Sequence, residues 1–142
     1  MRFMLIRKAD VKTEAGVLPT EPLMAAMGQY MEEMSKAGIL LAGEGLLASS
    51  KGARVKFSAG KPRVIDGPFP ETGQLIGGFC IIQVGSKQEA IDWVQRWPAL
   101  DGDGKVEVEI RQVAEAEDFG PEFTKEMREA EDRLRVEAAA RR

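Results

Sequence analysis

Hydrophobic positions divide the chain into predicted strands and helices. Residues 2–8 and 75–84 are apolar without polar alternation, which is typical of strands covered on both faces. Residues 39–47 form a third apolar run, and Gly43 and Gly45 within it predict a bend or bulge. Residues 105–113 alternate apolar and charged side chains, so we expect a strand with one exposed face.

Helical periodicity separates these strands. Apolar residues recur every 3.6 residues from position 23 to 37, between a capping Thr20 and a terminating Gly38. Ser86 and Glu89 form a predicted capping box that opens a second helix, which ends before Pro98. A last amphipathic helix is predicted after Gly120 and Pro121, with one apolar side formed by Phe123, Met127, Ala130 and Leu134.

Two short strands, residues 54–58 and 63–66, are predicted to form a hairpin inserted between the long strands. The turn signal Ala59-Gly60-Lys61-Pro62 joins them. Because Pro68 and Pro70 cannot donate ladder hydrogen bonds, the segment that follows is predicted to be a loop.

The order of elements predicts an α+β fold, a ferredoxin-like split βαβ sandwich with an antiparallel sheet. Two helices cover only one face of such a sheet, yet residues 2–8 and 75–84 are apolar on both faces. A second copy of the sheet is the simplest cover, so we expect a homodimer. We assign this domain to residues 1–114, followed by an acidic linker and a C-terminal helix over residues 115–142.

Composition narrows the classes of function. The chain has 142 residues, one cysteine and no histidine, which excludes an intrachain disulfide, a histidine zinc site and a Ser-His-Asp triad. Residues 1–114 carry 14 basic and 14 acidic residues, and residues 115–142 carry six and nine, so nucleic-acid binding is disfavoured. No apolar run is long enough to cross a bilayer and no secretory signal is visible, so we expect a cytoplasmic protein that does not bind membranes.

Two motifs match part of a known cofactor-binding or metal-binding sequence, but the residues and elements around them do not fit such a site. Gly43-Glu44-Gly45-Leu46-Leu47-Ala48 matches a dinucleotide-binding turn, but no helix is predicted to begin there and Glu44 would face the pyrophosphate. Asp101-Gly102-Asp103-Gly104 begins like a calcium loop, but Val106 stands where the required glycine belongs. We therefore predict a turn at the second motif, and neither a cofactor nor a metal.

The segment Asp66-Gly67-Pro68-Phe69 is the main candidate for chemistry. An aspartate before Gly-Pro can cap the turn, and this structural role is as plausible as a catalytic one. A rigid loop with a carboxylate and an aromatic ring also suits a small-molecule pocket, in which Glu44 would be the second carboxylate. If the two carboxylates converge in an apolar cavity, one pKa rises and a general acid or base results. The predicted site has Asp66 and Glu44 as catalytic residues and Phe69, Tyr30, Met27 and Met31 as substrate-binding walls.

Several segments together resemble the YCII-related proteins of the DGPF type. The resemblance covers approximately residues 1–114 and rests on four motifs in order: Gly43 to Leu46, Asp66 to Thr72, Ile76 to Phe79 and Ser86 to Ala90. It implies a dimeric α+β barrel in which two ferredoxin-like sheets pack face to face. The His–Asp pair proposed for some relatives cannot form here, because histidine is missing.

Two functions are expected. The first is binding of a small, partly apolar organic molecule between sheet and helices, with acid–base catalysis by carboxylates. The alternative is a noncatalytic accessory or ligand-sensing protein with a regulatory partner such as an extracytoplasmic sigma factor, which the resemblance implies because DGPF-type relatives often accompany such factors. The C-terminal helix would then be the interaction arm, although packing over its own domain is the favoured role for it.

Overall fold

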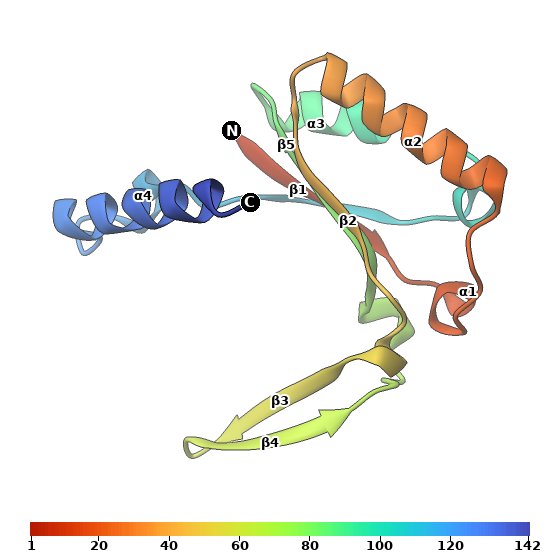
Figure 1. The fold of residues 1–142 in the computed structure, drawn as a ribbon, viewed down its shortest axis with the longest axis horizontal. Coiled ribbons are helices and arrows are strands. Elements are labelled where there is room, and N and C mark those ends of the chain that lie inside the picture. Colours follow the sequence, from red (N-terminus) through yellow and green to blue (C-terminus); the bar gives the residue numbers. More distant parts are fainter. The chain divides into compact units, whose positions relative to one another are not determined.

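A computed structural model describes residues 1–142 and divides them into two compact units, residues 1–112 and residues 113–142. The first unit is an α+β structure built on a four-stranded antiparallel sheet, with strand order β2-β5-β1-β6 (Figure 1). This order is the one predicted for a ferredoxin-like sandwich. The strands are β1 (Arg2–Lys8), β2 (Leu40–Gly45), β5 (Ile76–Gln83) and β6 (Val108–Gln112).

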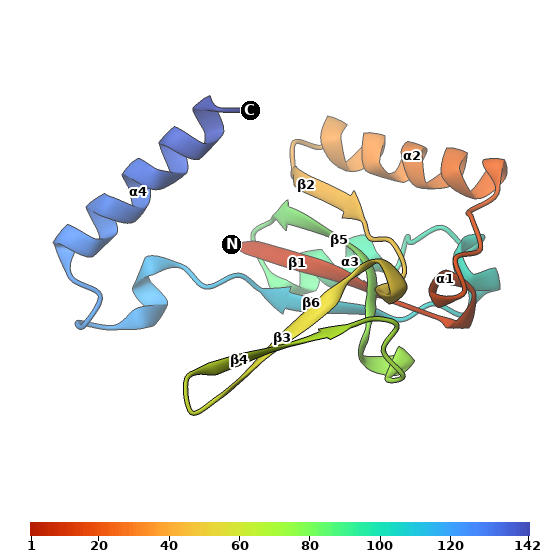
Figure 2. The ribbon, with the colours of Figure 1, turned by 60° about the horizontal axis from the view of Figure 1, so that its bottom comes forward.

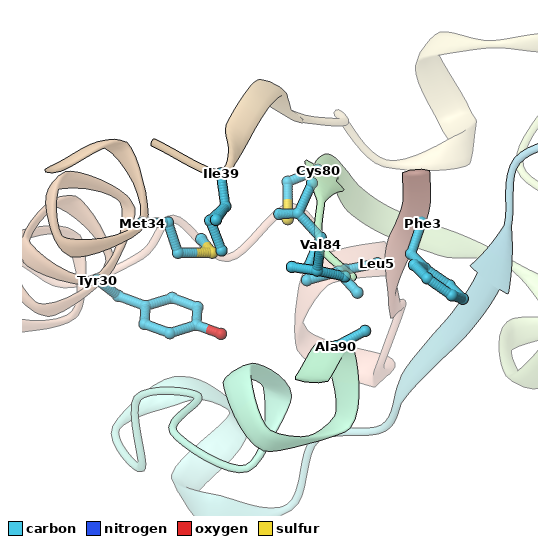
Figure 3. Close-up of a cluster of buried hydrophobic side chains, with 9 residues drawn as sticks. Phe3, Leu5, Tyr30, Met34, Ile39, Cys80, Val84 and Ala90 are labelled. Atoms are coloured by element: carbon cyan, nitrogen blue, oxygen red, sulfur yellow. The ribbon is translucent and has the colours of Figure 1, made fainter. Parts of the chain in front are cut away.

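The hydrophobic core lies between one face of this sheet and two helices, α2 (Glu21–Lys36) and α3 (Lys87–Val94), as Figures 1 and 2 show. Tyr30 of α2 reaches α3, where its hydroxyl donates a hydrogen bond of 2.6 Å to the carbonyl oxygen of Trp93. Figure 3 shows this core, whose members are Phe3, Leu5, Tyr30, Met34, Ile39, Cys80, Ile82, Val84 and Ala90.

Side-chain hydrogen bonds begin the helices close to where the sequence predicts. The Thr20 hydroxyl accepts from the Leu23 amide over 3.3 Å and caps α2. Ser86 caps α3 in the same way, which confirms one hydrogen bond of the predicted capping box. The second, from the Ser86 amide to the Glu89 carboxylate, is wrong. The Glu89 carboxylate accepts from the amide of Gly85, one residue before Ser86, over 2.8 Å.

Two other local predictions need correction. A four-residue helix, α1 (Val11–Glu14), lies between the first strand and α2, where the hydrophobic pattern predicts only a loop from Asp10 to Pro19. It forms because Asp10 caps it, accepting a hydrogen bond of 2.8 Å from the Thr13 amide. The register shift in β2 lies between Leu40 and Ala42 and not at the glycines.

The second face of the sheet, opposite the helices, has an apolar centre. Met4 pairs with Ile81, and Ile6 pairs with Phe79, so these side chains form two adjacent rows on that face. Since α2 and α3 lie on the other face, neither helix covers these rows, and the four side chains are half-buried.

The predicted hairpin is present as β3 (Ala53–Ser58) and β4 (Lys61–Asp66), and it projects away from the four-stranded sheet (Figure 1). Hydrogen bonds fix the base of the hairpin, residues 49–52 and 66–69, which we call the hairpin root. The Gly67 amide donates to the carbonyl oxygen of Gly52 over 3.0 Å, and the Phe69 amide donates to the Ser49 hydroxyl over 3.0 Å. Ser49 in turn donates from its amide and hydroxyl to the Glu14 carboxylate.

The second unit contains α4 (Lys125–Ala140), which Thr124 caps by accepting from the Met127 amide over 3.2 Å. The rings of Phe119 and Phe123 pack before it, with centroids 5.5 Å apart. None of the helices in the chain is long and apolar enough to span a membrane.

The hairpin root predicts a specific need for glycine at position 67, because a Cβ there would overlap the carbonyl oxygen of Ser49. We expect Gly67→Ala to lower the free energy of unfolding by about 1–3 kcal/mol, the usual effect of overpacking, and to increase trypsin cleavage within residues 53–66. Urea denaturation and limited proteolysis measure these effects. Gly73→Ala is the matched control, since a Cβ there meets no atom within 4 Å; equal behaviour of the two variants would contradict the prediction.

Candidate functional site

A cavity of about 430 Å³ lies between α2 and the helix-facing side of the sheet, and we call it the α2 cavity. Its floor is flat because four glycines replace side chains on neighbouring strands: a Cβ at Gly43, for example, would overlap the methyl group of Met31. The glycines of the floor are Gly43, Gly45, Gly77 and Gly78, and the α2 wall consists of Leu23, Met24, Met27 and Met31.

A buried ion pair forms part of the wall of the α2 cavity. The Arg7 guanidinium of β1 donates from Nε and Nη2 to the two carboxylate oxygens of Asp101, over 3.0 and 2.6 Å. The Trp97 indole donates to the same carboxylate over 2.9 Å. Arg7 and Asp101 are 8% and 7% exposed, and both line the cavity together with Trp97.

The remaining contacts of Arg7 fix it to the chain that follows β1. Nη1 donates to the carbonyl oxygen of Lys8 over 2.9 Å, and Nη2 donates to the Asp10 carboxylate over 3.2 Å. The hydrogen bond to Asp101 is the main cause that raises the pKa of Arg7, so the guanidinium stays charged. The bidentate geometry orients the planar group in one way only.

Two acidic groups line the cavity with perturbed pKa values. Burial acts to raise the pKa of Asp101, but hydrogen bonds from Arg7 and Trp97 and the charge of Arg7 outweigh it, and the pKa lies below its ordinary value of 3.8. Burial raises the pKa of the Cys80 thiol to about 11. Asp101 is therefore a carboxylate and Cys80 a thiol at neutral pH, and neither exchanges a proton there.

The structure separates the predicted site residues. Met27 and Met31 line the α2 cavity. Tyr30 lies in the core instead, 4% exposed, with its hydroxyl bound to the backbone of α3. Glu44 contributes to the cavity wall, but its pairing opposite Phe79 directs its side chain to the second face of the sheet.

Asp66 and Phe69 lie at the hairpin root, outside the α2 cavity. The guanidinium carbon of Arg54 sits 3.9 Å from the centroid of the Phe69 ring, and Arg54 also pairs with Glu71 over 3.0 Å. The convergence of Asp66 with Glu44 is therefore a prediction that the structure does not meet. The contacts of Gly67 and Phe69 fix the path of the loop that returns the chain from the hairpin to β5. The role of the Asp66 carboxylate stays a prediction.

Sequence reasoning missed Arg7, Trp97 and Asp101 as parts of a site. One signal was available for Arg7, which interrupts an apolar strand and shares its face with Phe3 and Leu5. A charge on a buried face requires a partner. The sequence cannot indicate which carboxylate that is, since Asp101 lies 94 residues away in a segment interpreted as a turn.

Fold and cavity together define a ferredoxin-like α+β protein with a ligand-sized space between its helices and its sheet. The chain belongs to the YCII-related domain family, whose model matches residues 1–116, and this confirms the predicted resemblance at the level of the family. An uncharacterised protein of Rhizobium meliloti (strain 1021) is 32% identical over 75 residues, or 53% of this chain. The matched segment spans 60% of that relative.

A more distant similarity is to a solved structure. It is the 5-chloro-2-hydroxyhydroquinone dehydrochlorinase of Burkholderia phenoliruptrix, in complex with 2,5-dihydroxybenzoquinone. The two chains are 16% identical with a TM-score of 0.48, over 80% of this chain and 94% of the other.

The buried pair predicts a large and pH-dependent effect of its removal. Asp101→Ala leaves the Arg7 charge buried and is expected to lower the free energy of unfolding at pH 7 by about 3–5 kcal/mol. Because the folded pKa of Asp101 is lowered, its contribution is present above its ordinary pKa of 3.8 and is lost as the pH falls through the folded value. The difference between wild type and variant should therefore shrink in acid, which urea denaturation at several pH values measures.

Glu32→Ala is the control for this measurement. It breaks the pair between Glu32 and Lys36, whose atoms are 3.1 Å apart on exposed side chains, and is expected to cost under about 1 kcal/mol. Equal losses for Asp101→Ala and Glu32→Ala at neutral pH would contradict the importance given to the buried pair.

Proposed function

We propose that this protein binds a small, partly apolar organic molecule in the α2 cavity. The observation that carries the proposal is the cavity itself, a space of about 430 Å³ lined by thioethers, an indole ring and the pair of Arg7 and Asp101. Ligand sites of proteins are typically clefts of this size, mostly apolar, with a few polar groups in fixed positions.

Two features of the α2 cavity cost stability, and both support a role in binding. Taking Arg7 and Asp101 out of water costs several kcal/mol per ion, and well-packed apolar side chains would stabilise the fold at least as well. Glycines inside strands also weaken a sheet. Sites that depart from the rules of stability in this way are typically functional.

The proposal concerns binding, which is the step that an acid–base enzyme and a ligand-sensing accessory protein have in common. Since Asp66 lies outside the α2 cavity, we assign it no proton transfer there. The compact unit of residues 113–142, with its amphipathic α4, supports the sensing alternative, because it offers an acidic segment to a regulatory partner.

Blocking the cavity tests the proposal. The neutral dye N-phenyl-1-naphthylamine, which fluoresces in apolar surroundings, is expected to bind the wild type. Met27→Trp places an indole in the cavity and should weaken that binding about tenfold, equivalent to about 1.4 kcal/mol. Met127→Trp is the matched control, because Met127 lies on α4 and is 53% exposed. The proposal would be contradicted if the dye did not bind the wild type, or if it bound the wild type and Met27→Trp with equal affinity.

We also propose that the protein is a homodimer joined through the second face of its sheet. The rows formed by Met4 with Ile81 and by Ile6 with Phe79 are apolar, whereas an antiparallel sheet that faces water is polar on that side. Charged Glu109 and Arg111 continue these rows on β6 and would form the rim of the interface. A twofold axis covers both sheets with one self-complementary contact.

Sedimentation velocity at micromolar concentration tests the homodimer. We expect a dimer for the wild type and a folded monomer for Ile81→Glu, because a carboxylate in the middle of the apolar rows would be buried without a partner. Val11→Glu, at a position of α1 that is 78% exposed, should remain dimeric. A well-folded wild-type monomer would sink the proposal.

A further inference from the structure

The charges around the α2 cavity limit the kind of molecule that it can hold. Arg7 is the one cationic residue in the wall, and its guanidinium already faces the carboxylates of Asp101 and Asp10. We propose that the cavity accepts an uncharged organic molecule with an acceptor oxygen, such as a ketone, ester or amide, and rejects carboxylates, sulfonates and phosphates. This inference rests on the proposed binding function and adds the chemical class of the ligand.

The charged groups around the Arg7 guanidinium carry more negative than positive charge. Asp101 neutralises Arg7 through two hydrogen bonds, and Asp10 adds a second negative charge 3.2 Å from Nη2. An anionic ligand would therefore enter a region that already has more negative than positive charges, inside apolar walls that screen poorly.

The Arg7 guanidinium also has one hydrogen-bond donor that the protein does not use. A guanidinium has five N–H groups, and those of Arg7 make four hydrogen bonds, to Asp101 twice, to Asp10 and to the Lys8 carbonyl oxygen. The fifth, on Nη1, has no acceptor in the protein. A Cβ at Gly77 would lie 3.4 Å from Nη1, so the glycine leaves this nitrogen uncovered at the cavity floor.

The excess of negative charge and the unused N–H group together favour an uncharged ligand that has a hydrogen-bond acceptor. The free N–H can donate to a carbonyl or ether oxygen, and an unpaired buried donor is costly, so the ligand oxygen satisfies it. The rest of the wall offers thioethers, the Trp97 ring and the protonated thiol of Cys80, none of which carries a charge. These groups favour contact with an apolar or aromatic body.

A pair of probes with one skeleton tests the inference. 2-Acetonaphthone carries a neutral carbonyl where 2-naphthoate carries a carboxylate, and the two have nearly the same shape. Protein labelled with ¹³C at the methionine methyl groups reports binding directly, because Met24, Met27 and Met31 line the cavity. We expect 2-acetonaphthone to bind the wild type at least about tenfold more tightly than 2-naphthoate.

Asp101→Asn tests the cause of the preference. The asparagine oxygen still accepts from Arg7, but one negative charge is gone, so 2-naphthoate should bind about tenfold more tightly than it binds the wild type. The ratio of the affinity for 2-acetonaphthone to the affinity for 2-naphthoate should therefore fall about tenfold. Asp103→Asn is the matched control, since it makes the same change of charge in the same loop on an exposed side chain that pairs with Lys12. It should leave the ratio of the two affinities unchanged.

The outcomes separate this inference from the binding proposal. If 2-naphthoate binds the wild type as tightly as 2-acetonaphthone, the preference for neutral ligands is wrong while the cavity remains a binding site. If neither probe shifts the cavity methionines, the binding proposal fails with it. Should Asp101→Asn not fold, Asp10→Asn removes the other charge beside Arg7 and keeps a good helix cap; an unchanged ratio there would overturn the electrostatic cause.

Discussion

The contact between Arg7 and Asp101 connects parts of the first unit that are far apart in the chain. Arg7 lies on a central strand, Asp101 follows α3, and the Asp10 carboxylate that Arg7 also contacts begins α1. One planar guanidinium thus positions three segments, and its four hydrogen bonds require that they meet in one geometry. The Trp97 indole joins the same carboxylate, so the wall of the α2 cavity is held by the pair as well. Fold and site share this interaction, and a change to it alters both.

The two faces of the sheet differ in what packs against them. The helix-facing side has a closed core near Leu5 and Ile82, where dense packing leaves no space for a ligand. Toward Gly43 and Gly78 the same side opens, because glycine and flexible methionine replace the branched side chains of the core. The second face has an apolar centre that neither α2 nor α3 covers. The first side therefore provides a site within one copy, and the second provides the surface through which we propose that copies associate.

The DGPF segment illustrates how a conspicuous motif can be structural. Asp66 ends a hairpin strand, Gly67 passes against the backbone of Ser49, and Phe69 packs below Arg54. Gly67 and Phe69 therefore have a local structural reason to be there. The cavity lies elsewhere and is built largely from residues that look ordinary in the sequence, such as glycines in strands and methionines in a helix.

Local chemistry determined most of the fold in advance. The helix from Glu21 to Lys36, the strand from Arg2 to Lys8 and the hairpin follow from periodicity, caps and turn residues, all of which act over a few neighbouring positions. The α2 wall of the site was predictable for the same reason, since Met27 and Met31 share a helix face. The partnership of Arg7 with Asp101 was not, because it joins positions 94 residues apart, and the sequence reports that a buried charge needs a counterion without reporting which one. Whether a carboxylate faces a cavity or lies beyond it depends on strand register and on the path of a loop, and only the tertiary structure decides these.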